Sequence, residues 1–253
     1  VMLCAVLSAL LLFVPSLSQL GQPADGWIGQ VYETFFHTSS PEYLLGDGVD
    51  PVGSIWIVGF VEEVLFYGRP TEVSELYFPF GLDLGVHEGF AWLDTLFAIP
   101  LRWMIGSPGF YHLHVLCTLV ISFVACYALF KLVSKSVVLS LFVAHLMVVN
   151  EFVYQEISYG RPTQVNWLFG ALFVYCAYKI LEDPERWTWP VAAGLTFAGY
   201  CLTYWFGAAG VGFISLFWLV SVHLKRQQIG LMFRNAILVM MGILTVIVPV
   251  CWR

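Results

Sequence analysis

Long uninterrupted apolar segments dominate the hydropathy pattern of this 253-residue chain. A helix that crosses the hydrocarbon core of a bilayer needs about 20 mostly apolar residues, and seven segments come close to that length. They are residues 2–20, 109–130, 137–156, 164–181, 189–204, 206–224 and 236–252. The uncharged stretch from Trp187 to His223 is too long for one span, so we divide it at Tyr204–Gly207. The pattern predicts an all-α, polytopic transmembrane bundle of about seven spans.

Composition argues against a soluble globular protein and against a nucleic-acid-binding protein. Hydrophobic residues make up 59% of the chain and charged residues only 11%, against about 25% charged residues in soluble domains. The net charge of -6 argues against a nucleic-acid partner, which requires a basic surface. The six cysteines lie in apolar segments and are expected to be core residues rather than disulfides or metal ligands. We interpret residues 1–253 as one transmembrane domain, part of a longer chain because it begins with Val1 and ends in an apolar segment.

The distribution of positive charge predicts the orientation in the membrane, because Lys and Arg are retained in cytoplasmic loops. Alternating the seven spans places seven of the eleven basic residues on one side, which carries a net charge of +4. The opposite side carries -10 and includes the long segment between the first two spans, residues 21–108. This segment is therefore expected to lie outside. Its two apolar stretches, Gly53–Tyr67 and Gly89–Ile105, are too short to span and predict interfacial helices that roof the bundle.

Two polar clusters lie within this outer loop. Asp47 and Asp50 are flanked by glycines just before an apolar helix, which suits a carboxylate held on a turn as a general base; the alternative is a pair of solvated acids that cap the helix. The second cluster contains Asp83, His87, Glu88 and Asp94. Such side chains are donors for a divalent cation, but they have no fixed ligand spacing. The alternative is interfacial polar residues, with Asp94 capping the second helix.

A third cluster, Glu156–Gln164, joins the third and fourth predicted spans. Arg161 precedes Pro162, which fits a first helical turn, so a guanidinium beside free helix N–H groups predicts a phosphate site. In the alternative, Arg161 is a surface residue paired with Glu156 or Glu151. The heptapeptide Tyr67–Val73 matches Tyr159–Val165 at six of seven positions, and we interpret it as a reused interfacial turn.

Histidines inside the spans give a weaker indication of chemistry. A lone histidine such as His145 is more often a hydrogen-bonded core residue than a ligand. His112 and His114 are two residues apart, so on a helix they diverge by about 200 degrees and do not form a metal site by themselves.

Several short motifs in this order resemble the polytopic GT-C glycosyltransferases and their bacterial relatives. They are Gly46-Asp47-Gly48-Val49-Asp50, Phe78-Pro79-Phe80-Gly81-Leu82, His87-Glu88, Gly106-Ser107-Pro108, Tyr111-His112-Leu113, the Glu156–Gln164 junction and Thr203-Tyr204-Trp205. The resemblance implies an enzyme of the bacterial inner membrane that transfers a sugar from a polyprenyl-phosphate donor to an acceptor on the outer face.

The resemblance also implies roles for individual residues. Asp47 or Asp50 would be the catalytic base, and Arg161 would contact the lipid phosphate. Glu156, Gln164, His87 and Glu88 would complete the substrate site. No metal is assigned, because an Asp-x-Asp element is lacking; a divalent cation stays open as a cofactor. The rival hypothesis is a non-catalytic membrane subunit, which implies partner membrane subunits.

Overall fold

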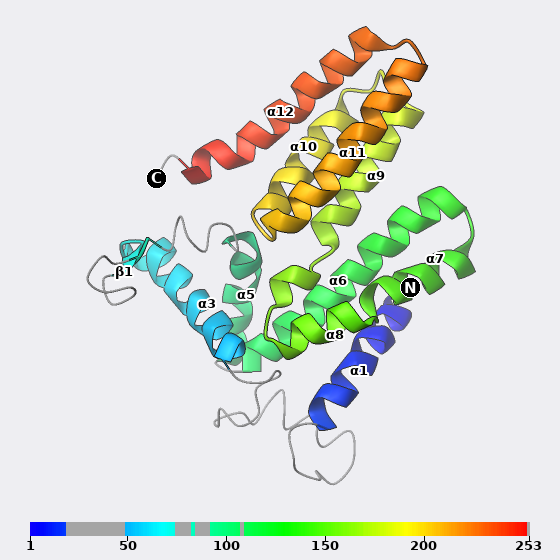
Figure 1. Ribbon diagram of the computed structural model, residues 1–253. Helices are drawn as coiled ribbons and strands as arrows, with labels where there is room; N and C mark the ends of the chain where they lie inside the picture. Colours follow the sequence, from blue (N-terminus) through cyan, green and yellow to red (C-terminus); the bar gives the residue numbers. More distant parts are fainter. Residues whose placement is uncertain (19–48, 74–81, 84–91, 107–108, 252–253) are drawn as a thin grey trace. The chain divides into compact units, whose positions relative to one another are not determined.

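The computed structural model describes residues 1–18, 49–73, 82–83, 92–106 and 109–251. Helices account for most of this part of the chain (Figure 1). In order they are α1 (Met2–Ser18), α3 (Val49–Tyr67), α5 (Trp92–Ile105), α6 (Gly109–Ser134), α7 (Val137–Val148), α8 (Glu151–Ser158), the 3-10 helix η2 (Pro162–Val165), α9 (Leu168–Glu182), α10 (Thr188–Cys201), α11 (Trp205–Lys225) and α12 (Ile229–Cys251). Two short strands, β1 (Glu72–Val73) and β2 (Leu82–Asp83), pair antiparallel. The predicted all-α class is confirmed, with this two-residue ladder as an unpredicted addition.

Four segments of the described chain are long and apolar enough to cross a membrane. They are Gly109–Ser134, Val137–Ser158, Phe206–Lys225 and Ile229–Pro249. The predicted number of about seven spans is not confirmed. Two of the other predicted spans form α9 and α10, with 15 and 14 residues, which corresponds to lengths of about 22 and 21 Å. Both are shorter than the hydrocarbon core, which is about 30 Å thick.

Local backbone structure explains why these two helices are short. The fourth predicted span began at residue 164, but η2 occupies the chain up to Val165 and α9 begins only at Leu168. The fifth predicted span ended at residue 204, but α10 ends at Cys201. Leu202–Tyr204 form the turn before α11 begins. The hairpin predicted at Tyr204–Gly207 therefore exists, but its turn lies slightly earlier in the sequence.

The third predicted span, residues 137–156, consists of two helices joined at Asn150. The Asn150 Oδ1 atom accepts a hydrogen bond from the Val153 N–H at 3.0 Å and caps the start of α8. Its Nδ2 atom donates to the carbonyls of Leu146 and Met147 at 3.1 and 3.0 Å, at the end of α7. One side chain thus satisfies backbone groups on both sides of the break.

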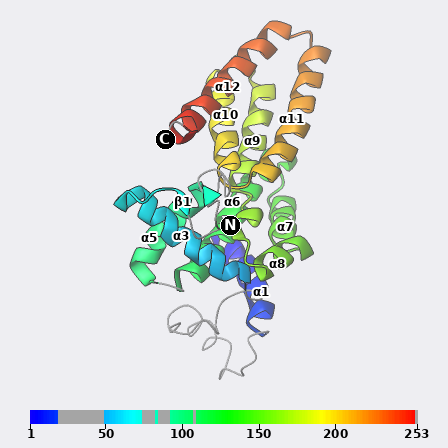
Figure 2. The same cartoon turned by 60° about the vertical axis from the view of Figure 1, so that its left-hand side comes forward.

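The chain folds into two compact units. The first unit comprises residues 1–121 and 145–166, and it contains both helices predicted in the outer loop. These helices, α3 and α5, pack against each other (Figures 1 and 2). The Glu62 carboxylate on α3 accepts hydrogen bonds from Arg102 at 2.5 Å and from Trp103 Nε1 at 2.8 Å, both on α5.

A hydrogen bond of 2.8 Å between Ser8 Oγ and the ring of His145 connects α1 to α7. His145 is therefore a hydrogen-bonded residue, as predicted.

The second unit comprises residues 122–144 and 167–253. Its helices α9, α10 and α11 run side by side, and α12 packs mainly on α10 (Figures 1 and 2). The core contains Phe173, Cys176 and Ile180 of α9 and Ala193 of α10. Cys126 and Cys176 are buried and free, as the sequence predicted for core cysteines.

Close contact between α10 and α12 depends on two glycines, Gly194 and Gly242. A Cβ atom on Gly242 would lie 2.6 Å from the Val191 carbonyl oxygen and 3.0 Å from the Gly194 Cα atom. Both neighbours are backbone atoms, which do not move aside without separating the helices. Small residues at such positions let helices approach closely within a membrane.

The substitution Gly242→Ala is therefore expected to destabilise the protein by about 1 to 3 kcal/mol through overpacking. The matched control is Gly230→Ala on the same helix, where a Cβ atom meets nothing within 4 Å. That change should be neutral or stabilising by up to about 1 kcal/mol, because Ala is the better helix former. Thermal unfolding of the two variants in detergent measures the difference. Equal melting temperatures would contradict the proposed helix contact.

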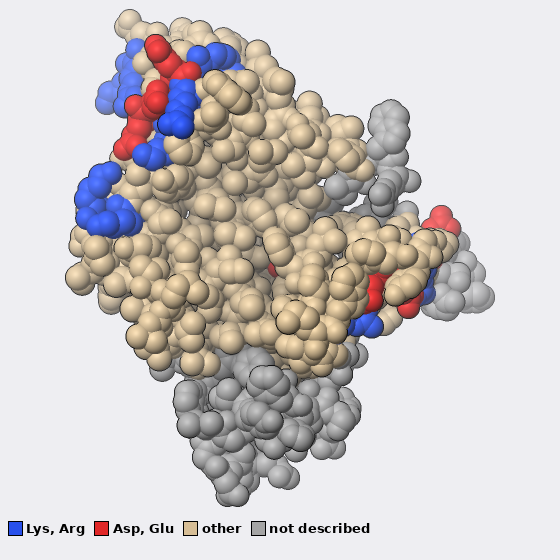
Figure 3. Space-filling model, turned by 180° about the vertical axis from the view of Figure 1, so that it is seen from behind, with Lys and Arg blue, Asp and Glu red and all other residues tan. Residues whose placement is uncertain are grey.

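Charged side chains of the second unit gather in one region of its surface (Figure 3). The basic residues lie at or near the α6–α7, α9–α10 and α11–α12 connections, together with Glu182, Asp183 and Glu185. The seven basic residues are Lys131, Lys135, Lys179, Arg186, Lys225, Arg226 and Arg234. These are the residues on which the sequence-based orientation depends.

Candidate functional site

The turn that carries Arg161 has a defined backbone structure at the end of α8. The Gly160 N–H donates to the Ile157 carbonyl at 2.9 Å, and the Arg161 N–H donates to the Glu156 carbonyl at 2.8 Å. Gly160 has a φ of 78°, a left-handed conformation that favours glycine. This is the Schellman arrangement of a helix C-terminus. It ends α8 just before Arg161 and Pro162.

The helix that follows Arg161 differs from the sequence prediction. Pro162 does occupy a first helical position, but η2 has only four residues. The predicted long helix with its dipole directed at a phosphate is therefore wrong, because the next long helix, α9, begins seven residues after Arg161. A phosphate contact at this turn depends on the guanidinium itself. Gln164 is half-buried in η2, and its N–H donates to the Arg161 carbonyl at 3.2 Å.

The side chains around Arg161 include the two acids that the sequence offered as its partners, Glu151 and Glu156. Arg161 is exposed, and its guanidinium stacks over the ring of Tyr159 at 5.4 Å from the centroid. Glu151 accepts a hydrogen bond from Gln155 at 3.1 Å. The Glu156 Oε2 atom is buried and has no hydrogen-bond partner among the described residues, so this oxygen does not receive the Arg161 guanidinium. The Glu156 Oε2 atom is thus a buried hydrogen-bond acceptor next to the Gly160–Arg161 turn.

A hydrogen bond attaches α3, the first helix of the segment predicted to be an outer loop, to this turn. The Ser54 hydroxyl on α3 donates to the Gly160 carbonyl at 2.7 Å. Asp50 lies in the first turn of the same helix, one turn before Ser54, and is therefore helical rather than held on the predicted glycine turn. The fold brings the start of α3 next to the Arg161 turn, although 106 residues separate Ser54 from Gly160. Asp47, His87 and Glu88 lie outside the described residues.

Three buried polar side chains lie close to this region within the first unit. Asp94 Oδ2 is 2.9 Å from His114 Nε2, and Asp94 Oδ1 accepts a hydrogen bond from Asn166 Nδ2 at 2.9 Å. Asp94, His114 and Asn166 are only 3%, 6% and 6% exposed. Asp94 lies in the first turn of α5, in agreement with the alternative in which it caps or opens this helix, and its carboxylate also joins α5 to α6 and to the segment after η2. We refer to these three residues as the Asp94 network.

The electrostatics of the Asp94 network favour an ionised carboxylate. Burial by itself raises the pKa of Asp94, but the charge of His114 and the hydrogen bonds from His114 and Asn166 outweigh it, so the pKa is lowered below its usual value. A buried carboxylate with two donors is stable as an anion. The network therefore fixes the chain just beyond η2, five residues from Arg161.

Sequence reasoning missed the role of His114 because it considered this residue only together with His112. The available signal was an acid in the outer loop and a histidine at the start of the next apolar span. In the part of the chain that the structure describes, no group of three His, Cys, Asp or Glu side chains is arranged to hold a metal ion. The cation considered for the second cluster would depend on His87 and Glu88.

The two copies of the repeated heptapeptide share a left-handed glycine, but η2 follows Arg161 whereas strand β1 follows Arg69. Gly68 has a φ of 70°, close to that of Gly160. Arg69 forms an ion pair with Glu63, and its guanidinium lies 4.9 Å from the centroid of the Phe60 ring. The Arg69 and Glu63 side chains are 39% and 51% exposed. Arg69 thus offers a matched comparison for Arg161.

No protein-family model, curated protein sequence or solved structure matches this chain.

Proposed function

We propose that the protein is a membrane-embedded GT-C type glycosyltransferase that moves a sugar from a polyprenyl-phosphate donor to an acceptor on the outer membrane face. The observation that supports this proposal is the Ser54–Gly160 hydrogen bond, because it brings the start of α3, with Asp50, next to the Arg161 turn. Sugar transfer from a lipid phosphate needs a base for the acceptor hydroxyl and a cation for the departing phosphate. The two sequence elements expected to supply them are thus neighbours.

In this mechanism Asp50 or Asp47 takes the proton from the acceptor hydroxyl. The acceptor oxygen attacks the anomeric carbon as the bond to the phosphate oxygen breaks, and the Arg161 guanidinium stabilises the phosphate that leaves. In this proposal the Glu156 Oε2 atom, which is buried and has no partner among the described residues, accepts a hydrogen bond from the substrate. Gln164, His87 and Glu88 complete the proposed substrate site. No step in this scheme requires a metal ion.

One observation favours the alternative, a non-catalytic membrane subunit. The Asp94 network is deeply buried, and its carboxylate is bonded to two partners within the protein. Such a group stabilises a fold without acting on a substrate. Binding of the lipid-phosphate carrier at Arg161 distinguishes the two functions, because a scaffold has no need of it.

The substitution Arg161→Ala is expected to weaken binding of polyprenyl phosphate to the full-length protein by roughly 10- to 100-fold. A charge-assisted hydrogen bond contributes about 1.5 to 3 kcal/mol, and a factor of ten corresponds to about 1.4 kcal/mol. Arg161→Lys should be intermediate, since lysine keeps the charge but lacks the forked geometry. Equilibrium binding in detergent micelles or nanodiscs measures these affinities.

The control for this experiment is Arg69→Ala, in the matching turn. Arg69 is not part of the proposed substrate site and forms an ion pair with Glu63 at the surface, so its removal should change carrier affinity much less. Equal affinities of the wild type and Arg161→Ala would remove the phosphate site and favour the scaffold. Equal losses in both arginine variants would indicate a nonspecific charge effect.

The proposed orientation places the outer loop on the outer face of a bacterial inner membrane and the basic connections of the second unit in the cytoplasm. Single cysteines at Gly48 and Ser134, in a background without the native cysteines, are expected to react differently with an impermeant thiol reagent in intact cells. Gly48→Cys should be labelled, and Ser134→Cys, between α6 and α7, should be labelled only after lysis. The reverse pattern would invert the topology.

A further inference from the structure

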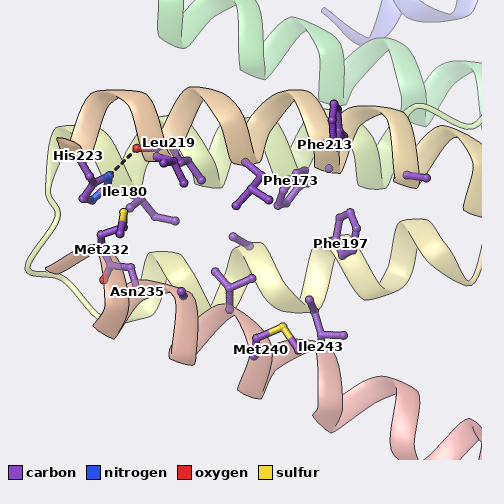
Figure 4. Close-up of a pocket in the computed structure, with 17 residues that line it drawn as sticks. Phe173, Ile180, Phe197, Phe213, Leu219, His223, Met232, Asn235, Met240 and Ile243 are labelled. Carbon is purple, nitrogen blue, oxygen red and sulfur yellow. Dashed lines mark hydrogen bonds between the residues drawn. The ribbon is translucent and has the colours of Figure 1, made fainter. Parts of the chain in front are cut away.

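The second unit contains a cavity of about 430 Å³ among α9, α10, α11 and α12. This volume is within the range of pockets that enclose a small ligand. Most of its lining is apolar, and Phe197, Phe213 and Ile243 lie at one end (Figure 4). His223, Met232 and Asn235 lie at the other end. The cavity thus has a long apolar part and a polar end.

A buried nitrogen at the polar end points to a ligand. The His223 side chain is 2% exposed, and its Nδ1 atom donates to the Leu219 carbonyl at 2.9 Å. The other ring nitrogen, Nε2, is buried and has no hydrogen-bond partner among the described residues. A buried polar atom normally has a partner in the protein, in water or in a ligand. A phosphate oxygen can accept a hydrogen bond from Nε2 when the ring is the imidazolium, in which both nitrogens are donors.

The connections of the second unit near this end carry seven basic residues and three acids, Glu182, Asp183 and Glu185, so their net formal charge is +4. Arg226 follows α11 directly and donates to the Leu181 carbonyl at 2.8 Å. Arg234, on α12, donates to Oδ1 of the cavity residue Asn235 at 3.1 Å and also to the Pro184 carbonyl. These arginines belong to the basic connections of the second unit. An anionic group at the cavity's polar end would therefore meet a favourable potential.

Two of the helices that line the cavity, α11 and α12, make few contacts with each other. α12 packs extensively on α10 and only sparsely on α11, and α11 and α12 diverge from their connection (Figure 1). Because α11 and α12 are both long enough to cross a membrane, an apolar chain in the surrounding bilayer can reach the cavity from the side.

We infer that the second unit binds an anionic phospholipid, whose acyl chain occupies the cavity between α11 and α12 and whose phosphate lies at the His223 end. Charge complementarity selects this ligand, since the apolar part fits a hydrocarbon chain and the basic end fits a phosphate. The site involves no residue of the proposed transferase site, which belongs to the first unit. This lipid is bound in addition to any sugar donor.

The test measures binding of palmitoyl-oleoyl phosphatidylglycerol and of the zwitterionic palmitoyl-oleoyl phosphatidylcholine to the full-length protein by native mass spectrometry. The wild type is expected to prefer phosphatidylglycerol by roughly tenfold. Ala236→Phe introduces a ring at a cavity-lining position of α12 and should weaken binding of both lipids by at least about tenfold. His223→Leu should remove most of the preference for phosphatidylglycerol while acyl-chain binding persists.

Ile237→Phe is the matched control, because Ile237 is the next residue of α12, is exposed and does not line the cavity. It should bind both lipids as the wild type does, and unchanged melting temperatures verify that the variants are folded. Wild-type affinity in Ala236→Phe would show that the lipid does not occupy the cavity. Equal affinity of the wild type for both lipids would exclude an anionic site at His223.

Discussion

Replacing Asp47 and Asp50 together by Asn is expected to lower the rate of sugar transfer by about 100- to 10,000-fold, the usual contribution of a general base. Asn has nearly the same shape as Asp but does not accept the acceptor's proton at neutral pH. Asp50 lies in the first turn of α3, which the Ser54–Gly160 hydrogen bond attaches to the Arg161 turn. The initial rate with a polyprenyl-phosphate-sugar donor measures the effect.

The single variants identify which carboxylate acts as the base, and Glu63→Gln provides the control. Glu63 is an acid on the same helix, but it is half exposed and paired with Arg69, so its replacement should leave the transfer rate nearly unchanged. Carrier affinity should also persist in the double variant, because Arg161 is intact. Full activity of the double variant would refute the assignment of the base.

Removal of the Asp94 carboxylate is expected to destabilise the protein by about 3 to 5 kcal/mol, because each of the two buried polar partners that loses its acceptor costs about 1 to 3 kcal/mol. In Asp94→Ala, the His114 and Asn166 side chains lose the acceptor that both now share. For a chain of this size, the melting temperature should fall by roughly 6 to 20 °C. Thermal unfolding of the purified protein in detergent measures this change.

The same variant predicts a pH dependence whose sign follows from the lowered pKa of Asp94. A carboxylate with a lower pKa in the folded state stabilises the fold above its unfolded pKa, which is about 3.9. This stabilisation is lost as the pH falls through the folded pKa. The melting temperatures of the wild type and Asp94→Ala should therefore differ most at neutral pH and approach each other below about pH 4.

The exposed Arg69–Glu63 pair provides the control for this stability measurement. Glu63→Ala should cost no more than about 1 kcal/mol, as is usual for surface ion pairs. Similar losses in Glu63→Ala and Asp94→Ala would contradict a special role for burial. A difference between the wild type and Asp94→Ala that grows as the pH falls would contradict the assigned sign.

Hydropathy predicted most helices but not where all of them begin and end. Apolar length alone indicated the spans that became α6 and α11, because their ends coincide with polar or charged turns. It placed the start of α12 seven residues late, at residue 236 instead of Ile229, because α12 includes the polar residues Arg234 and Asn235. It gave the wrong start for α9, since the η2 turn after Pro162 consists of residues that a hydropathy window counts as part of the span. A hydropathy profile carries no information about the local hydrogen bonds that determine where a helix begins or ends.

The candidate site was predicted in its parts but not in its connections. The Gly160–Arg161 turn is a local structure, and nearly the same heptapeptide occurs twice in the sequence. The sequence alone therefore indicated a turn at this position. The Asp94 network joins residues that are 20 and 72 positions apart. Pairings at such separations depend on how helices pack, which no single sequence pattern specifies. For the same reason, the attachment of α3 to the Arg161 turn by Ser54 was not predicted.

The double role of Asn150 has a consequence for how this chain is accommodated in a membrane. Residues 137–158 are apolar enough to be inserted as one segment, although the folded protein divides them into α7 and α8. A broken helix in hydrocarbon normally exposes peptide groups at a cost of several kcal/mol. The Asn150 amide forms hydrogen bonds with backbone groups at both helix ends. These backbone groups are therefore paired within the protein. The break between α7 and α8 therefore leaves fewer backbone groups for water or a neighbouring helix to satisfy than a break without this side chain would.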